Sequence, residues 1–309
     1  MSRSRQPGEL AQAVGDPRTG AWLWVLLGVG GLLLIGGGAV IDMPGLMEGG
    51  ASWWRPLITM PGYLVLLLSW WRLGPTFSRP RLVTAIWSAV LVLMPPLHSR
   101  DSYSYSAQGW LMTHGLDPYL VPSGMAGKAG LLVGRHWFRT TSVYPPLAVE
   151  SFHGVAKLVG EHLLFVPMAM RLPNLVAMVV LAWTLPRLAR RVGISERLAL
   201  WAGLLNPLII TQWVGGIHSD AVMVAALGLA FLAAGNAAWR GYAGALAGGA
   251  LIGVSMGFKQ SAAVAGLGVI ALAWQAGLPR IDPERRNWWG LFWRSAAGGG
   301  AAIGTFTAL

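Results

Sequence analysis

The sequence predicts an all-α fold, a polytopic bundle of transmembrane helices with one large structured loop on its outer side. Of the 309 residues, 54% are hydrophobic and only 11% are charged, whereas about 25% are charged in a typical soluble domain. The apolar residues form runs long enough to cross a bilayer, and short strips of arginine separate these runs. Composition and patterning together indicate a multi-pass membrane protein.

Composition also excludes several classes of function. The chain has no cysteine, which rules out disulfides, cysteine-ligated zinc, iron–sulfur clusters and thiol catalysis. Its net charge of +11 does not indicate a nucleic-acid partner, because the arginines lie in strips between apolar runs and not on one face of a soluble module.

The candidate spans follow a tail, residues 1–20, whose arginines precede an apolar run too long for a signal-peptide core. We therefore expect a cytoplasmic tail and an uncleaved first span. Residues 21–97 hold the first three spans. Residues 163–309 hold the further ones, and because the last run is unfinished we expect a truncated C-terminus. The runs are 21–41, 57–73, 82–97, 163–188, 198–214, 221–239, 241–258, 260–278 and one from about 291.

If the N-terminus is cytoplasmic and successive spans alternate in direction, most basic residues lie inside the cell, as membrane insertion favours. This holds only if residues 98–162 form one loop on the outer side. Some basic residues, including every lysine, are then left outside. An anionic ligand such as a lipid phosphate is one reason for cations there, and snorkelling or loop solvation is the alternative. These residues are Arg55, Arg100, Lys128, Arg135, Arg139, Lys157, Arg171 and Lys259.

Two short helices are predicted within the outer loop. In PLAVESFHGVAKLVG, residues 146–160, Glu150, His153 and Lys157 share one helical stripe and apolar residues share the other, which is typical of a helix lying in the membrane interface. The stretch SYSYSAQGWLMTHG predicts a helix from about Asp101 that Gly115 closes, with its tyrosines and tryptophan at the bilayer boundary.

Asp101 is the first candidate functional residue. It lies where an apolar run ends, and a carboxylate at the mouth of a membrane bundle indicates function. Arg100 beside it would keep it ionised, the state that a general base requires. The alternative is that Asp101 only caps the following helix.

A second group of candidates follows a broken span. In NPLIITQWVGGIHSD, Asn206-Pro207 interrupts the run and a Gly-Gly pair precedes His218 and Asp220, which indicates a cavity. His218 and Asp220 are too few ligands to specify a divalent cation, so we expect no metal site or cofactor, although a cation remains an alternative. Lys259, in a turn predicted on the same side, and Arg171 are cations suited to a phosphate, with loop solvation the alternative for the lysine.

The chain resembles the GT-C superfamily of membrane glycosyltransferases, and more closely the actinobacterial polyprenol-phosphomannose-dependent α-1,6-mannosyltransferases of lipomannan synthesis. The resemblance covers roughly residues 85 to 265. It rests on SRDSYSYSAQGWL after an early span, HGLDPY at 114–119, SVYPPLA at 142–148, RLPN at 171–174, NPL and GGIHSD within 206–220, and the lysine at 259.

This resemblance implies a GT-C bundle in the cell membrane whose outer loop, residues 98–162, is catalytic. The reaction implied is inverting mannosyl transfer from a polyprenyl-phosphate-mannose lipid to a growing α-1,6-mannan glycolipid of the lipomannan type. Asp101 matches the base that accepts the proton of the acceptor hydroxyl. The phosphate or sugar of the donor would be bound by Arg171, His218 and Lys259, with Asp220, Tyr144, Arg100 and Arg139 as further candidates.

A transporter or flippase for a lipid-linked or anionic substrate is the alternative function, because broken spans and outer cations also suit a substrate pathway. The polar candidates gather toward one membrane face, which favours an interfacial enzyme.

Overall fold

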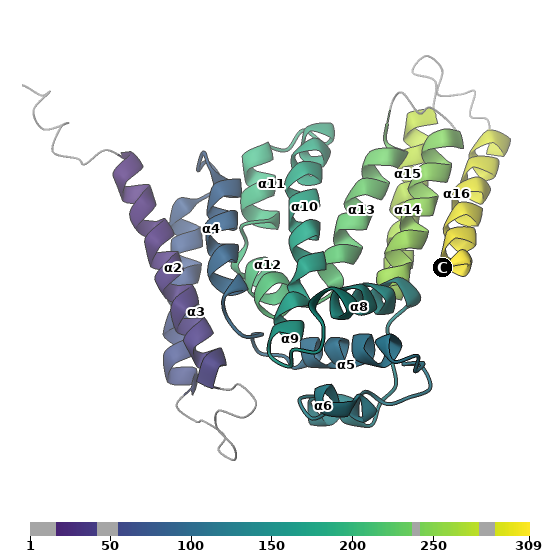
Figure 1. The fold of residues 1–309 in the computed structure, drawn as a ribbon. Helices are drawn as coiled ribbons and strands as arrows, with labels where there is room; N and C mark the ends of the chain where they lie inside the picture. Colours follow the sequence, from purple (N-terminus) through teal and green to yellow (C-terminus); the bar gives the residue numbers. More distant parts are fainter. Residues whose placement is uncertain (1–16, 42–54, 237–241, 278–287) are drawn as a thin grey trace, which may run out of the picture.

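The computed structural model describes residues 17–41, 55–236, 242–277 and 288–309, and every regular element within these ranges is a helix (Figure 1). The all-α prediction is therefore confirmed for the described chain. Most of the predicted tail, residues 1–20, lies outside the described residues. So do Arg240, Arg280, Arg285 and Arg286, which the predicted topology places inside the cell.

The predicted spans correspond to helices that stand side by side and alternate in direction (Figure 1). The span from 198 to 214 is divided into three pieces, and those from 163 to 188 and from 260 to 278 are each divided into two. In chain order the elements are α2 (Pro17–Ile41), α3 (Arg55–Leu73), α4 (Pro80–Val92), α10 (Arg171–Arg191), α11 (Glu196–Gly203), α12 (Pro207–Ile209), η2 (Ile210–Gly215), α13 (Asp220–Ala234), α14 (Tyr242–Phe258), η4 (Gln260–Ala265), α15 (Gly266–Gly277) and α16 (Trp288–Ala308).

Two of the described helices are long and apolar enough to cross a membrane, Gly20–Ile41 and Phe165–Arg191. A third span exists if the pair Glu196–Gly203 and Pro207–Gly215, which meet at 45°, is counted as one. Several other apolar helices are too short to cross a membrane. Helix α4, for example, has 13 residues, where about 20 are needed to cross the hydrocarbon core. Two or three candidate spans are thus established, fewer than the sequence predicts.

The predicted break at Asn206-Pro207 is confirmed and has a local cause. The Asn206 side chain accepts a hydrogen bond from the Leu208 N–H at 2.9 Å, so it caps a new helix that starts at Pro207. The chain then winds as a π-helix through η2, a form common at functional sites. The broken helix ends at Gly215 and Gly216, which lie at the end of the bundle.

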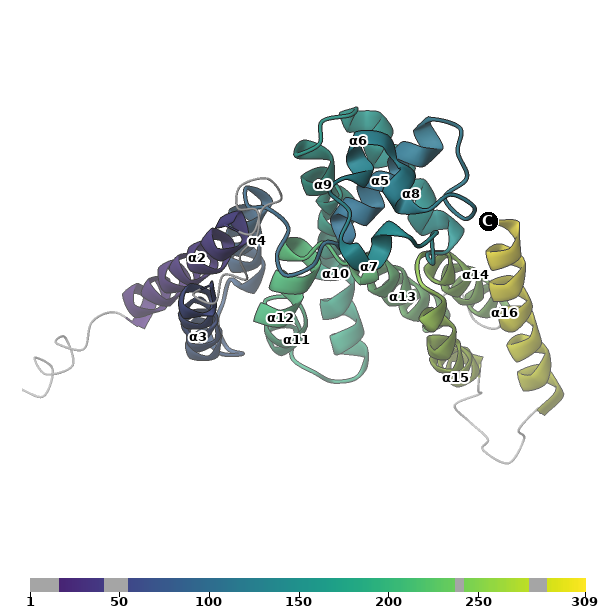
Figure 2. The same ribbon diagram turned by 90° about the horizontal axis from the view of Figure 1, so that it is seen from below.

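Residues 98–162 form a layer across one end of the upright helices (Figures 1 and 2). Its elements, together with the short helix that follows it, are α5 (Asp101–Thr113), η1 (Ser123–Met125), α6 (Gly127–Gly130), α7 (Arg135–Phe138), α8 (Pro146–Val159) and α9 (Phe165–Ala169). The predicted closure of α5 by Gly115 is confirmed. Gly115 has φ +71°, and the Leu116 N–H bonds the Leu111 carbonyl at 2.9 Å, as in a Schellman motif.

Helix α8 has the predicted amphipathic pattern, but its apolar face contacts protein and not lipid. Phe152, Val155 and Ala156 are buried against α5. The two helices meet at Gly109, where an added Cβ would lie 2.5 Å from the Phe152 carbonyl oxygen. The interpretation of 146–160 as a helix lying in the membrane interface is corrected accordingly, because α5 covers the face that would contact lipid.

Candidate active site

Asp101 occupies the first turn of α5, and both of its carboxylate oxygens have partners. The Trp137 indole N–H donates to Asp101 Oδ1 at 2.8 Å, and His218 Nδ1 lies 3.3 Å from Asp101 Oδ2. The Asp101 backbone N–H donates to Ser99 Oγ at 3.0 Å, and the Asp101 side chain makes no capping bond. Capping as the sole role of Asp101 is therefore wrong.

The environment of Asp101 favours its charged form. Burial acts to raise the pKa of the carboxyl, but hydrogen bonds from His218, Ser99 and Trp137 outweigh burial, so the pKa lies below its ordinary value. The side chain is 18% exposed, so a ligand can still reach it. An ionised, oriented and partly accessible carboxylate can accept a proton.

Two closely packed turns bring Asp101 and His218 together. The Leu97 N–H bonds the Gly215 carbonyl at 2.9 Å, and a Cβ on Gly215 would lie 2.4 Å from Leu97 Cδ1. His98 and Ile217 adopt left-handed backbone conformations, with φ of +59° and +62°. Such conformations are costly for a β-branched residue and cluster at functional sites.

Two tyrosine hydroxyls form a second part of the site. Tyr105 Oη lies 3.0 Å from Tyr144 Oη, and the Tyr105 ring stacks on Phe152 with centroids 4.3 Å apart. Burial raises the pKa of both phenols above the ordinary value, so both are neutral hydrogen-bonding groups near pH 7. Tyr103 and Tyr105 are 5% and 2% exposed, which corrects their interpretation as residues at the bilayer boundary.

Lys259 and Asp220 form an ion pair, with Lys259 Nζ 2.6 Å from Asp220 Oδ1. Asp220 begins α13 and Lys259 follows α14, so the pair joins the ends of two helices. The sequence predicted a turn at Lys259 on the same side as His218 and Asp220, and the contact with Asp220 places Lys259 at that end of the bundle. His218 and Asp220 instead point to different partners, and in the described ranges no three His, Asp or Glu side chains gather as metal ligands.

Arg171 does not belong among the phosphate-binding candidates. It is 1% exposed, and its guanidinium donates to the carbonyls of Val214 at 2.8 Å, Met94 at 2.6 Å and Val92 at 3.3 Å. These bonds tie α10 to the ends of α4 and η2. Because the side chain is almost fully buried and each of its three nitrogens bonds a carbonyl within the bundle, Arg171 is a structural residue, and its prediction as a donor ligand is corrected.

Arg100 and Arg139 are exposed on the two segments that meet at Asp101. Arg100 precedes Asp101 and packs over Gly134, where an added Cβ would lie 3.2 Å from Arg100 Cβ. Arg139 follows α7, the helix that carries Trp137. The structure therefore brings together Asp101 and His218, places the two arginines on the segments next to Asp101 and Trp137, and places the Asp220–Lys259 pair at the ends of α13 and α14.

Trp137 is the site residue that the sequence did not reveal. It lies 36 residues beyond Asp101, in a helix of four residues, too short to give a periodic signal. The run GRHWF resembles an ordinary polar loop, and only tertiary packing turns the indole toward the carboxylate.

Comparison with known proteins gives a consistent result. The family profile described as "Alpha-(1->6)-mannopyranosyltransferase, N-terminal domain" matches residues 18–276. The chain is 40% identical over 143 residues to a probable alpha-(1->6)-mannopyranosyltransferase of Mycolicibacterium smegmatis, a match covering 45% of this chain and 26% of the relative.

Further relatives have the same description. Alpha-(1->6)-mannopyranosyltransferase A of Mycobacterium tuberculosis is 37% identical over 190 residues, which is 60% of this chain and 35% of that protein. Its counterpart in Corynebacterium glutamicum is 31% identical over 176 residues, 57% of this chain and 35% of that protein. The matches thus span only about a quarter to a third of these relatives. No solved structure matches.

The family profile covers most of the chain, including both turns that form the Asp101–His218 contact. The chain belongs to the alpha-(1->6)-mannopyranosyltransferase family.

Proposed function

We propose that this protein transfers mannose from a polyprenyl-phosphate-mannose lipid to a growing α-1,6-mannan acceptor, with inversion at the anomeric carbon, on the outer face of the membrane. The observation that carries the proposal is the contact of Asp101 with Trp137 and His218, which places one oriented carboxylate at the end of the bundle in a chain of this family.

In the proposed reaction Asp101 is the general base. The acceptor hydroxyl oxygen attacks the anomeric carbon, its proton passes to the Asp101 carboxylate, and the bond from that carbon to the phosphate oxygen breaks. Trp137 holds Oδ1, so Oδ2, which faces His218, is the oxygen that accepts the proton. The indole fixes the carboxylate direction, and positioning of this kind lowers the barrier.

The leaving polyprenyl phosphate gains negative charge, which nearby cations stabilise. The side chains of Arg100, next to Asp101 in the chain, and of Arg139, at the end of the helix that carries Trp137, are exposed, and guanidinium groups suit a phosphate. Lys259 is positioned by Asp220 at 2.6 Å. The neutral Tyr144 hydroxyl is a hydrogen-bonding group for the sugar.

The membrane orientation is part of the proposal. Arg72, Arg79 and Arg81 lie at the end of the bundle opposite the 98–162 layer, where α3 ends and α4 begins (Figure 1). The end of α10, with Arg187, Arg190 and Arg191, lies at that same end. Because arginines are retained on the cytoplasmic side, this separation supports an extracytoplasmic Asp101. Polar groups at one end of the bundle also favour an enzyme over the alternative of a transporter or flippase, which binds its substrate near the midplane.

The test is the Asp101→Asn variant, which keeps the side-chain shape and removes the base. With radiolabelled polyprenyl-phosphate mannose and a mannan acceptor, we expect membranes carrying this variant to lose at least about a hundredfold in transfer rate, the lower range for a missing acid or base. Asp117→Asn is the matched control, because Asp117 lies in the same layer and its carboxylate accepts a hydrogen bond from the Tyr119 N–H, which an amide oxygen can accept as well. Normal transfer by Asp101→Asn would refute the proposal.

A further inference from the structure

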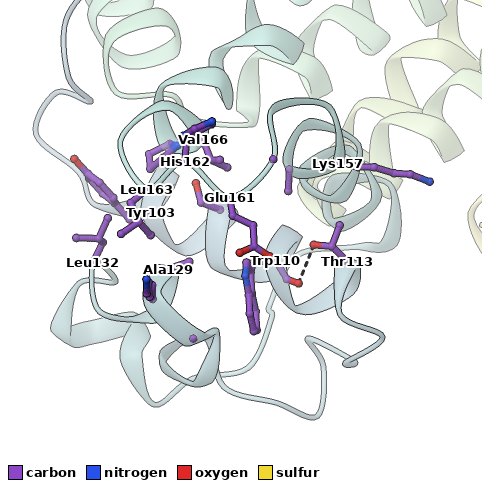
Figure 3. Close-up of a pocket in the computed structure, with 16 residues that line it drawn as sticks. Tyr103, Trp110, Thr113, Ala129, Leu132, Lys157, Glu161, His162, Leu163 and Val166 are labelled. Atoms are coloured by element: carbon purple, nitrogen blue, oxygen red, sulfur yellow. Dashed lines mark hydrogen bonds between the residues drawn. The ribbon is translucent and has the colours of Figure 1, made fainter.

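A cavity of about 430 Å³ lies beside α5, with Tyr103, Trp110 and Thr113 of that helix in its wall (Figure 3). In a helix, successive residues turn by about 100°, so the side chains of α5 divide into two faces. One face carries Asp101, Tyr105 and Gln108. The opposite face lines the cavity with Tyr103, Ser106, Trp110 and Thr113.

The other walls come from segments distant in sequence. They include α6 with Lys128 and Ala129, and the turn after α8 with Glu161, His162 and Leu163. The volume lies within the usual range of small-molecule sites, about 300–1,000 Å³. The side chains used by the proposed reaction, Asp101 and His218, do not line it.

The polar groups of the cavity suit a neutral, hydroxyl-rich ligand. The Glu161 carboxylate lies over Trp110, whereas the Lys157 ammonium extends away from the cavity (Figure 3). His114 holds this arrangement, with Nε2 3.1 Å from Glu161 Oε1 and its ring stacked 3.7 Å from that of Trp110. Lys128 also lines the cavity, so its charge and that of Glu161 offset one another. The carboxylate accepts hydrogen bonds from hydroxyls and the ammonium donates to them. An indole adds an amphipathic surface for the apolar face of a sugar ring.

An apolar groove of about 480 Å³ adjoins this cavity and shares His162 with it. Val92, Phe165, Leu172 and Leu175 line the groove, which follows the start of the candidate span Phe165–Arg191. Phe165 is 63% exposed. An exposed apolar groove along a span suits a lipid chain. Because the cavity adjoins the groove, a sugar attached to that chain would lie in the cavity.

We propose that the cavity and groove together bind the sugar–lipid junction of a neutral mannosyl glycolipid, at a second site separate from the reaction centre. The proposal rests on the proposed function, because it takes the acceptor to be a lipid-anchored mannan. A helix with its side chains is about 10–12 Å thick, so a sugar in this cavity is not the acceptor sugar whose hydroxyl gives its proton to Asp101. The site holds the anchored end of the glycan while another part of it reaches the base.

The experiment measures binding without catalysis. The whole protein is placed in phosphatidylcholine nanodiscs with a photoreactive alkyl α-mannoside, and the crosslinked residues are mapped by mass spectrometry. We expect labels at Trp110 and in residues 161–163. Glu161→Ala, which removes the carboxylate, should weaken binding about tenfold, as expected when a charge-assisted hydrogen bond is lost.

Glu150→Ala is the matched control, because Glu150 is also an exposed glutamate of this layer and contacts a histidine, His153, at 3.5 Å. It does not line the cavity, and we expect it to bind the probe like the unaltered protein. Leu163→Trp, which fills the cavity, is the second variant. It should abolish labelling while the thermal midpoint of unfolding stays the same.

Competitors separate the ligand classes. Unlabelled alkyl mannoside should displace the probe far better than methyl α-mannoside, which lacks the chain, or an alkyl phosphocholine, which lacks the sugar. Equal displacement by the phosphocholine, or stronger displacement by phosphatidylglycerol, would overturn the proposal in favour of a plain lipid groove or an anionic lipid site. Unchanged labelling of Glu161→Ala and Leu163→Trp would overturn it as well.

Failure of this inference is distinguishable from failure of the proposed function. Asp101→Asn should bind the probe normally while losing transfer. If it keeps transfer, the reaction proposal fails whatever the probe shows. If it loses transfer and the cavity variants still label fully, only the second site is refuted.

Discussion

At the scale of single residues, the site depends on how the Asp101 carboxylate is shared. Trp137 holds one oxygen at 2.8 Å and His218 approaches the other at 3.3 Å. Burial alone would raise the pKa of Asp101, so that the carboxylate would become protonated, and inactive as a base, at a higher pH. The hydrogen bonds reverse this direction, so the neighbours of Asp101 extend the pH range in which it can accept a proton.

This balance predicts a shift in the acid limb of the transfer rate. Of the interactions that lower the pKa of Asp101, the hydrogen bond from His218 is the largest. In His218→Ala the pKa of Asp101 should therefore rise, so that activity begins to fall at a higher pH during acidification. Trp137→Phe should shift the limb in the same direction but less. Transfer rates measured from about pH 3 to 7, across the ordinary carboxyl range, test this. An acid limb that stays in place in both variants would contradict the role of the hydrogen bonds.

At the scale of elements, Arg171 holds the bundle together at the end that carries the site. Its guanidinium joins α10 to the carbonyls at the end of α4 and to Val214 in η2. Asn174, one turn later, donates to the carbonyls of Trp213 and His218 at 2.7 and 3.0 Å. These side chains satisfy backbone groups that the broken helix leaves without helical partners, so they fix the turn that presents His218.

Replacing Arg171 with lysine should therefore destabilise the protein. One ammonium cannot reproduce the planar set of bonds to three carbonyls, and we expect a loss of about 2–4 kcal/mol, given about 1–3 kcal/mol for each buried group left unsatisfied. The thermal midpoint of unfolding in detergent measures the loss, with Arg135→Lys, on the exposed α7, as the control. A normal midpoint with a raised KM for the donor would instead restore Arg171 as a phosphate ligand.

At the scale of the whole molecule, the 98–162 layer and the arginines near residues 72–81 and 187–197 lie at opposite ends of the bundle (Figure 1). The layer has a buried cluster of its own, which includes Ala107 and Leu111. A second cluster, with Tyr105 and Phe152, joins the layer to Ile217 at the end of the bundle. The layer is therefore a packed body lying across the helix ends, and we expect all of it to lie on one side of the membrane.

Cysteine accessibility tests this orientation directly, because the chain has no cysteine of its own. On intact cells, an impermeant maleimide should label Glu150→Cys, on the exposed face of α8. It should label Glu196→Cys, at the start of α11, only after permeabilisation. Labelling of Glu196→Cys alone on intact cells would reverse the topology and place Asp101 in the cytosol.

By itself the sequence determined the local features of this protein. The apolar runs predicted the helices, Asn206-Pro207 predicted a break, Gly115 predicted a helix end, and the polar stripe of residues 146–160 predicted an amphipathic helix. These features depend on contacts within a few residues, which periodicity, capping and turn chemistry encode. Asp101 was found in the same way, because a carboxylate at the end of an apolar run is unusual wherever the chain goes next.

Only the tertiary structure decided which distant groups meet. It placed Trp137 and His218 on Asp101, used the Arg171 donors inside the bundle, and covered the apolar face of α8 with α5 in place of lipid. A sequence pattern shows that a helix face must be buried but not what buries it, and it shows that a cation is present but not which oxygen accepts its hydrogen bonds. Those choices depend on the packing of segments far apart in the chain, where no local propensity acts.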